Sequence, residues 1–304
     1  QTKSSQTEHR HSYKTVFVTP PTCAQKGYTT YTCEVCGDSY RDDYVAATGH
    51  KMKDGVCTVC GGSDSGLSYT LCSDRRSYLV SVGDSADEKI IVPAEHEGKP
   101  VVGVAAGGFS GCTALREITL PESVYMIGEK AFYHCRGLTT VAFEGALENI
   151  DASAFAGCTG LEEIDLSGGT LSIGEKAFSG CDRLERVLWS EDLETVSAEA
   201  FSGCAKLTSI CLSRSVTKIA ATAFRGCSLV SVSVREENET YYSVNNCLVQ
   251  RDTKTLILGT AGGSIPSDGS VTAIGAYAFA DNPTLESVFV PAAVEKLGTG
   301  VFWG

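Results

Sequence analysis

Two short motifs near the N-terminus combine residue types that bind metal ions. They are Cys33-Glu-Val-Cys36-Gly37 and Cys57-Thr-Val-Cys60-Gly61. In a C-x-x-C-G turn two thiolates converge on one ion, and the glycine permits the left-handed backbone that lets amide groups face the sulfurs. Together the motifs have the spacing C-x2-C-x20-C-x2-C, close to that of zinc ribbons. The sequence therefore predicts structural zinc in this part of the chain.

The ligand set stays open at this point, because Cys23 and His50 are further candidates. The candidate zinc ligands are Cys23, Cys33, Cys36, His50, Cys57 and Cys60. They could form one four-cysteine site, one mixed site of Cys23, Cys33, Cys36 and His50, or two sites. A closed four-ligand site leaves no position for water, so we expect it to stabilise the fold rather than to catalyse. Disulfide bonds are the alternative, and an extracellular compartment would favour them.

The segment that must position these ligands is polar, rich in threonine and tyrosine, and poor in aliphatic residues. Such a short segment buries little core and needs another source of stability. We expect residues 1–65 to form a small zinc-ribbon-like module, with short strands near residues 28–32 and 39–44 around the first motif. A glycine-rich joint at residues 61–66 separates it from a second domain at residues 66–304.

The second domain repeats with a period of 23 residues, which predicts a solenoid. One phase of the repeat is always phenylalanine, at Phe109, Phe132, Phe155, Phe178, Phe201 and Phe224. A cysteine follows three residues later each time, at Cys112, Cys135, Cys158, Cys181, Cys204 and Cys227. Residues in one phase of a fixed period do the same structural job in every coil.

Residues 138–160 illustrate what each coil is expected to contain. A strand with alternating inward side chains is followed by a polar turn, a second inward apolar pair, and a short helical turn that carries Ala154 and Phe155. Neighbouring coils stack phenylalanine on phenylalanine, because one coil cannot bury its own apolar side. We expect the cysteine column to be free buried thiols, since stacked side chains point in parallel and are poorly placed for bridging. The predicted fold class is an α/β solenoid of short parallel strands and short helical turns.

The array deviates from the period at its start and once in its interior. Residues 66–108 contain strand-like runs that we expect to cap the solenoid and form its first coil. The spacing from Phe224 to Phe279 is longer than two periods, which predicts a hairpin excursion at about residues 235–267. Three strand-like runs lie inside it, at residues 241–244, 247–250 and 255–258.

Units such as the one at residues 115–135, with Leu-Pro after the strand and Ile-Gly-Glu-Lys-Ala-Phe before the cysteine, resemble the BspA-like leucine-rich repeats of bacterial surface proteins. The N-terminal segment is similar to short Cys/His modules that accompany surface proteins of anaerobic gut bacteria. The resemblance implies a horseshoe-type solenoid, an extracellular or cell-surface location, and adhesion to host or bacterial proteins. His134 replaces the glycine of Phe-x-Gly-Cys, and Asp281 and Asn282 replace Gly-Cys.

Composition excludes several classes of function. The net charge of −12 argues against a nucleic-acid partner, because such proteins cluster lysine and arginine. No apolar run is long enough to cross a bilayer. No catalytic constellation stands out, so we expect a non-enzymatic monomer that binds a protein ligand, such as host matrix or cell-surface protein. The alternative is a structural spacer that displays other domains.

Strand alternation predicts where such a partner would bind. One outward-facing group combines two acids with apolar neighbours on adjacent coils, and we call it the strand-face strip: Glu163, Asp165, Arg186, Leu188 and Cys211. Short side chains on stacked strands make a smooth surface that reaches across several coils. An acidic and apolar strip suits a basic, partly hydrophobic protein segment.

Overall fold

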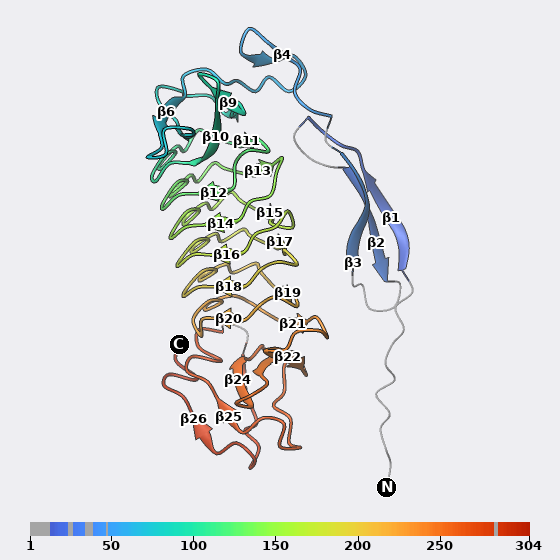
Figure 1. Cartoon of the computed structure of the whole chain (residues 1–304). Helices are drawn as coiled ribbons and strands as arrows, with labels where there is room; N and C mark the ends of the chain where they lie inside the picture. Colours follow the sequence, from blue (N-terminus) through green and yellow to red (C-terminus); the bar gives the residue numbers. More distant parts are fainter. Residues whose placement is uncertain (1–12, 24–26, 34–38, 47, 283–284) are drawn as a thin grey trace. The chain divides into compact units, whose positions relative to one another are not determined.

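The computed structural model describes residues 13–23, 27–33, 39–46, 48–282 and 285–304. The chain divides into two compact units, Gln1–Gly61 and Gly62–Gly304, and each is described by itself (Figure 1). None of the described residues forms a helix that could span a membrane.

Unit 1 is a small all-β module with little apolar core. Its strands are β1 (Tyr13–Thr19), β2 (Gly27–Cys33), β3 (Ser39–Val45), β4 (Met52–Lys53) and β5 (Val56–Cys57). The first three form an antiparallel sheet in the order β1-β2-β3, and β4 and β5 form a hairpin. Among the described side chains of this unit, Phe17, Val18, Tyr44 and Val45 are exposed, whereas Cys23 and Cys57 are buried. The centre of the described module is therefore sulfur-rich rather than aliphatic.

Unit 2 is a solenoid with a continuous sheet along one face (Figure 1). The sheet has the order β20-β18-β16-β14-β12-β10-β7-β6, and its strands pair in parallel from β7 to β20. Its strands are β6 (Ser68–Leu71), β7 (Tyr78–Ser81), β10 (Lys99–Val104), β12 (Met126–Ile127), β14 (Asn149–Ile150), β16 (Ser172–Ile173), β18 (Thr195–Val196) and β20 (Lys218–Ile219), with β9 (Glu95–His96) paired to β10 off this path.

The other strand column is divided into three short parallel sheets rather than one. Their strands are β8 (Lys89–Ile91), β11 (Glu117–Leu120) and β13 (Thr140–Phe143), then β15 (Glu163–Asp165) and β17 (Arg186–Leu188), then β19 (Ser209–Leu212) and β21 (Ser231–Val234). Partners lie one period apart, as with Glu163 opposite Arg186. This column carries the strand-face strip.

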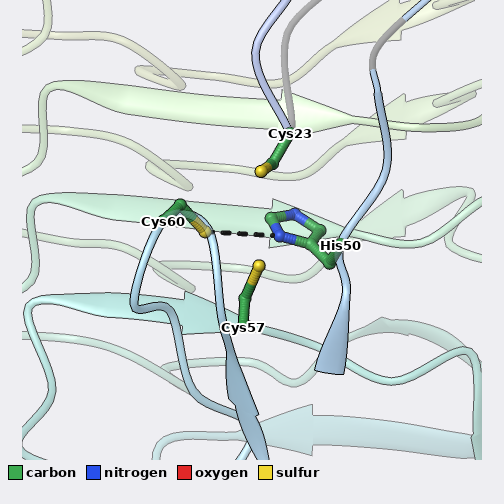
Figure 2. A group of neighbouring side chains, drawn as sticks. All are labelled: Cys23, His50, Cys57 and Cys60. Atoms are coloured by element: carbon green, nitrogen blue, oxygen red, sulfur yellow. Dashed lines mark hydrogen bonds between the residues drawn. The ribbon is translucent and has the colours of Figure 1, made fainter. Parts of the chain in front are cut away.

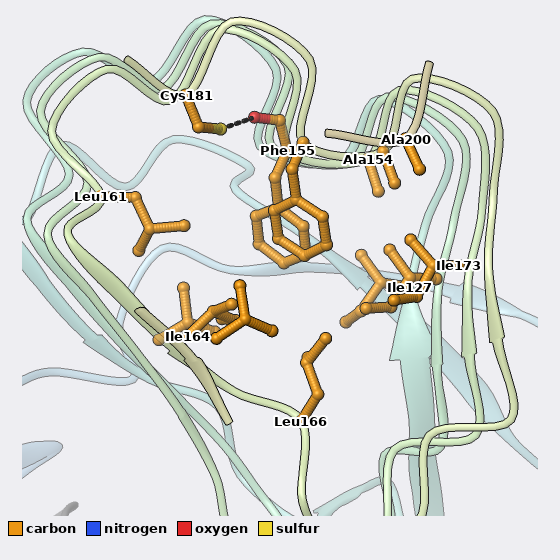
Figure 3. Close-up of a cluster of buried hydrophobic side chains, with 14 of the residues drawn as sticks. Ile127, Ala154, Phe155, Leu161, Ile164, Leu166, Ile173, Cys181 and Ala200 are labelled. Carbon is orange, nitrogen blue, oxygen red and sulfur yellow. Dashed lines mark hydrogen bonds between the residues drawn. The ribbon is translucent and has the colours of Figure 1, made fainter. Parts of the chain in front are cut away.

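Stacked rings fill the space between the two strand columns. The six phenylalanines from Phe109 to Phe224 stack with centroid separations of 5.0 to 5.4 Å, and the first five are fully buried. In Figure 3, Phe155 lies between the Ile127–Ile173 column and Ile164. Cys181 donates its thiol hydrogen to the carbonyl oxygen of Phe155 in the same view. The predicted column of buried free thiols is confirmed for Cys135, Cys158, Cys181, Cys204 and Cys227, whereas Cys112 is only half-buried.

The short helical turns predicted for each coil are wrong, because the described residues contain no helix. The amide of Phe132 donates to Ala154 in the next coil at 2.7 Å, and the amide of Phe155 donates likewise to Ala177. Lys130 and His134 have φ of 56° and 57°, in the left-handed region where a right-handed helix cannot continue. Hydrogen bonds between coils thus replace the i→i−4 bonds of a helix, and the fold is a β-solenoid.

The array leaves its regular path after β21. The strands β22 (Tyr241–Val244), β23 (Cys247–Gln250) and β24 (Thr255–Leu258) are antiparallel and occupy the three segments for which the sequence predicts strands. Buried Asn238 fixes this exit, because its side-chain amide donates to the carbonyls of Ser213 and Val216 at 2.9 and 3.0 Å.

The parallel ladder then resumes from β24 through β25 (Ala273–Ile274) to β26 (Lys296–Leu297). Arg225 connects the coils on either side of the excursion. It forms an ion pair with Asp281, and its guanidinium lies 5.3 Å from the centre of the Trp303 ring.

Candidate functional site

Three separate segments of unit 1 bring four potential metal ligands together. The thiols of Cys23, Cys57 and Cys60 and the imidazole of His50 have ligand atoms that all lie within 4.8 Å of one another. The four side chains point toward one another in Figure 2. Cys60 Sγ lies 3.4 Å from His50 Nδ1. Three sulfurs and one imidazole are a ligand set that structural zinc uses.

Local backbone geometry explains how Cys57 and Cys60 are presented. Asp54 and Gly55 link β4 and β5, and both have positive φ, 52° and 76°, as the tight turn of a two-residue hairpin requires. After the hairpin, the amide of Gly61 donates to the carbonyl of Cys57 at 2.9 Å, and its φ is 74°. This is the left-handed glycine expected from the C-x-x-C-G motif.

Backbone hydrogen bonds hold the other two ligands beside this turn. The amide of Thr48 donates to the carbonyl of Thr22 at 2.8 Å, and the amide of Gly49 donates to that of Cys23 at 3.1 Å. These two bonds place the segment before His50 next to the segment that carries Cys23. Cys23 and His50 are therefore close in space although they lie far apart in the sequence.

The electrostatics of the cluster favour a thiolate. The backbone amide of Cys60 is the largest cause that lowers the pKa of Cys57, to about 5, against the opposing effect of burial. The amide of Val59 and the side chain of His50 lower it further. Nε2 of His50 is buried and lacks a hydrogen-bond partner among the described residues. A bound cation would satisfy both the thiolate and an imidazole nitrogen, so these residues fit zinc.

Four of the six predicted ligands are thus brought together, in a combination that the sequence alone does not single out. Cys23 and His50 join the second C-x-x-C motif rather than the first. The side chain of Cys33 and the whole of Cys36 lie outside the described residues. Cys23, Cys57 and Cys60 are not joined to one another by disulfide bonds in the structure.

The strand-face strip is less acidic than its sequence suggests. Arg186 lies opposite Glu163 in the β15–β17 ladder, with Nε 3.6 Å from Oε2. Asp165 accepts hydrogen bonds from the hydroxyl and the amide of Ser167 at 2.6 and 3.0 Å. Leu188 lies beside Asp165 and is half-buried. The strip is therefore a surface of mixed charge, in which Glu163 is paired with Arg186 and Asp165 is hydrogen-bonded to Ser167.

Cys211 belongs to the next short sheet, on β19, and its thiol is exposed. It lines a hollow of about 730 Å³ together with Arg214, Glu191 and residues 233–237. Arg235 donates to Glu191 across this hollow at 2.7 Å. These charged residues were not among the binding residues predicted from the sequence. The charge run at 235–237, where the period breaks, is the signal that could have found them.

Comparison with known proteins places this geometry in a family. The sequence matches the family model of the BspA type leucine-rich repeat region in six copies. The matches cover residues 102–231 and 260–304, which is more than half of the chain. No curated protein matches the sequence.

Among solved structures, the pneumococcal vaccine antigen PcpA is similar, with a TM-score of 0.66 and 28% identity over 78% of this chain. This chain covers 65% of that protein, so it corresponds to less than two thirds of its length. A leucine-rich cell-surface protein from Faecalibacterium prausnitzii A2-165 has the same fold, with a TM-score of 0.59 and 24% identity over 79% of this chain and 73% of that one. The chain belongs to the BspA-type leucine-rich repeat family.

Proposed function

We propose that this chain is a bacterial surface or secreted protein that binds a host or bacterial protein through the strand-face strip and the hollow beside it. Family membership and the similarity to a pneumococcal vaccine antigen and a cell-surface protein support a role at the cell surface. The observation that carries the proposal is the hollow at Cys211, because it gathers exposed charges of both signs that can complement those of a partner protein.

The chemistry of this surface suits a polar protein segment with an apolar anchor. Arg186 and Cys211 are exposed, and Leu188 offers a half-buried apolar group between them. Arg235 and Glu191 form an ion pair whose side chains are each 56% exposed, so a partner can compete for either charge. Because Arg235 and Glu191 carry opposite charges, they would fix the position of a bound partner and would not simply attract a partner of one charge.

Binding of the full chain to a panel of purified host extracellular-matrix proteins tests this proposal. We expect saturable binding to at least one of them. The double variant Asp165→Lys with Leu188→Glu should abolish that binding without lowering the melting temperature. The control is Lys206→Glu, which changes an exposed charge outside the strip and the hollow. No binding across the panel would favour a spacer that displays other domains, and unchanged binding by the double variant would exclude this surface.

A catalytic role for the cysteine column receives no support from its chemistry. Burial raises the pKa of Cys135 and of Cys181 to about 12. A thiol that stays protonated at neutral pH and is closed to solvent is a poor nucleophile. We therefore propose binding rather than catalysis.

The second part of the proposal is that unit 1 holds one structural zinc ion through Cys23, His50, Cys57 and Cys60. Support comes from the 4.8 Å limit on all ligand-atom separations and from the unpartnered His50 nitrogen. Elemental analysis of purified protein should find at least one zinc per chain. Thiol counting on denatured, unreduced protein decides against the disulfide alternative if Cys23, Cys57 and Cys60 are free. Blocked thiols at these positions would overturn the zinc proposal.

A further inference from the structure

A second hollow, of about 580 Å³, lies on the turns of the solenoid, away from the strand-face strip. It crosses three successive coils, in the turn segments between β12 and β13, β14 and β15, and β16 and β17. The four repeat positions that line it are occupied in all three coils, at residues 130, 133, 134 and 136 and their equivalents 23 and 46 residues later. We call it the turn-side hollow.

The sequence creates this hollow by making the middle coil small. The outer coils place Lys130 and Lys176 at one repeat position, and the middle coil places Ser153 between them. At the next position the middle coil has Ala156 where the preceding coil has Tyr133. Coils stack about 4.8 Å apart, so the two lysines arise about 10 Å from each other, which is the length of one or two sugar rings.

The walls of the hollow are basic on a chain with a net charge of −12. Lys130, Arg136 and Lys176 line it, and Asp182 is the single carboxylate among its lining residues. Arg136 is exposed and has no ion-pair partner among the described residues. Lys130 pairs with Glu129, and Lys176 pairs with both Glu175 and Glu199, but the two lysine side chains are 53% and 44% exposed. Such surface pairs contribute little, so a ligand anion can compete with them.

An aromatic and hydroxyl-rich lining accompanies the charge. The rings of Tyr133 and His134 meet at a centroid distance of 4.0 Å, and both residues are half-buried. His134 lies against Gly157, where a Cβ atom would come within 2.2 Å of its Nδ1. That nitrogen is buried and has no hydrogen-bond partner among the described residues, which is uncommon in folded proteins. Ser153, Thr159 and Ser179 add hydroxyl groups that can donate to or accept from sugar hydroxyls.

We propose that the turn-side hollow binds an acidic saccharide. A carboxylate or sulfate group would lie among Lys130, Arg136 and Lys176, because a planar guanidinium pairs with such oxygens in two parallel hydrogen bonds. The apolar face of the sugar would lie on Tyr133, and its hydroxyls would meet the small polar residues of the middle coil. This site is separate from the strand-face strip, so its test does not depend on the protein-binding proposal.

Titration of the full chain with defined saccharides tests the inference. The probes are 3′-sialyllactose, trigalacturonic acid and a sulfated heparin disaccharide, with lactose as the neutral control and inorganic phosphate as a competitor. We expect saturable binding of at least one acidic probe, weaker at high salt, and no binding of lactose. Absence of saturable binding for all three acidic probes would overturn the proposal, as would phosphate competing as strongly as the saccharides.

Two variants locate the site. Arg136→Glu should weaken binding by about tenfold or more, which corresponds to losing one charge-assisted pair. Arg183→Glu makes the same change in charge at an exposed side chain that does not line the hollow, and should leave the affinity unchanged. Thr159→Trp fills the hollow without changing charge and should abolish binding. Equal effects of the two arginine variants would show non-specific attraction and contradict a built site.

Discussion

Cys181 Sγ donates to the carbonyl oxygen of Phe155, 26 residues earlier, at a distance of 3.2 Å. The same bond recurs from Cys158 to Phe132 and from Cys204 to Phe178, at 3.1 and 3.3 Å. Each thiol therefore caps the turn of the preceding coil while its sulfur fills the core. A cysteine suits this position because it is small, apolar and still able to donate.

Removing this thiol should make the solenoid less sensitive to alkali. Burial raises the pKa of Cys181 to about 12, above the value near 9 of an exposed thiol. Between these two pH values the unfolded state releases the proton and the folded state keeps it, so stability falls as pH rises. Below pH 9 both states are protonated and this contribution is fully present.

Cys181→Ala should cost about 1–2 kcal/mol at pH 7, from a weak hydrogen bond and a small void. Denaturant melts at pH 7 and pH 10 measure both effects. We expect the loss of stability between the two pH values to be smaller in Cys181→Ala than in the unsubstituted protein, since the variant lacks this thiol and the charge of Cys181 no longer raises the pKa of Cys158 and Cys204. An identical loss would mean that Cys181 is not held protonated.

The phenylalanine column should carry much of the stability, in a position-dependent way. Phe178 is fully buried between Phe155 and Phe201, so Phe178→Ala should cost about 3–5 kcal/mol. Phe302 stacks on Phe279 alone among the described rings and is 49% exposed, so Phe302→Ala should cost clearly less. Chemical denaturation of the two variants provides the comparison. Equal costs would contradict a stacked column whose terminal member is only half covered.

Gly157 and Gly111 have the same backbone conformation but different surroundings, so comparing them separates backbone strain from steric contact with His134. Both have a left-handed backbone, with φ of 74° and 75°. A Cβ atom at Gly111 meets nothing within 4 Å, whereas one at Gly157 meets His134 Nδ1 at 2.2 Å. Gly111→Ala should cost about 1–2 kcal/mol from backbone strain alone. Gly157→Ala should cost more, and His134→Gly should remove that excess in the double variant. An excess that survives in the double variant would exclude the steric explanation.

The sequence predicts those features that depend on local periodicity. The column from Phe109 to Phe224, the buried thiols and the hairpin excursion follow from spacing alone, because each coil repeats one structural role. The helical turns were wrong because amides of these segments, such as that of Phe155, bond to carbonyls of the next coil. The spacing of Ala154 and Phe155 shows that both face inward, but it does not distinguish a helical turn from a turn that is bonded to its neighbour.

The residue types of the candidate zinc site could be predicted from the sequence, but the four residues that come together could not. Cysteine and histidine spacing indicates zinc, yet which ligands meet depends on the bonds that join residues 48–49 to residues 22–23. These are contacts between distant segments without any sequence periodicity. Glu163 and Arg186 pair across neighbouring strands, a contact that the alternation of side chains along one strand does not reveal.

Removing the proposed zinc ion should unfold unit 1 and leave the solenoid intact. Both tryptophans of the chain, Trp189 and Trp303, lie in unit 2, so their fluorescence reports only on the solenoid. Treatment of the full chain with a strong chelator should expose residues 13–61 to protease, because structural zinc supplies folding free energy that a module with little core lacks. The tryptophan-detected melting curve should not change. Cys57→Ser should reproduce the protease sensitivity without chelator and lower the zinc content, whereas Cys72→Ser, at a half-buried cysteine of unit 2 outside the cluster, should do neither. Protease resistance that survives complete removal of zinc would contradict a structural role for the ion.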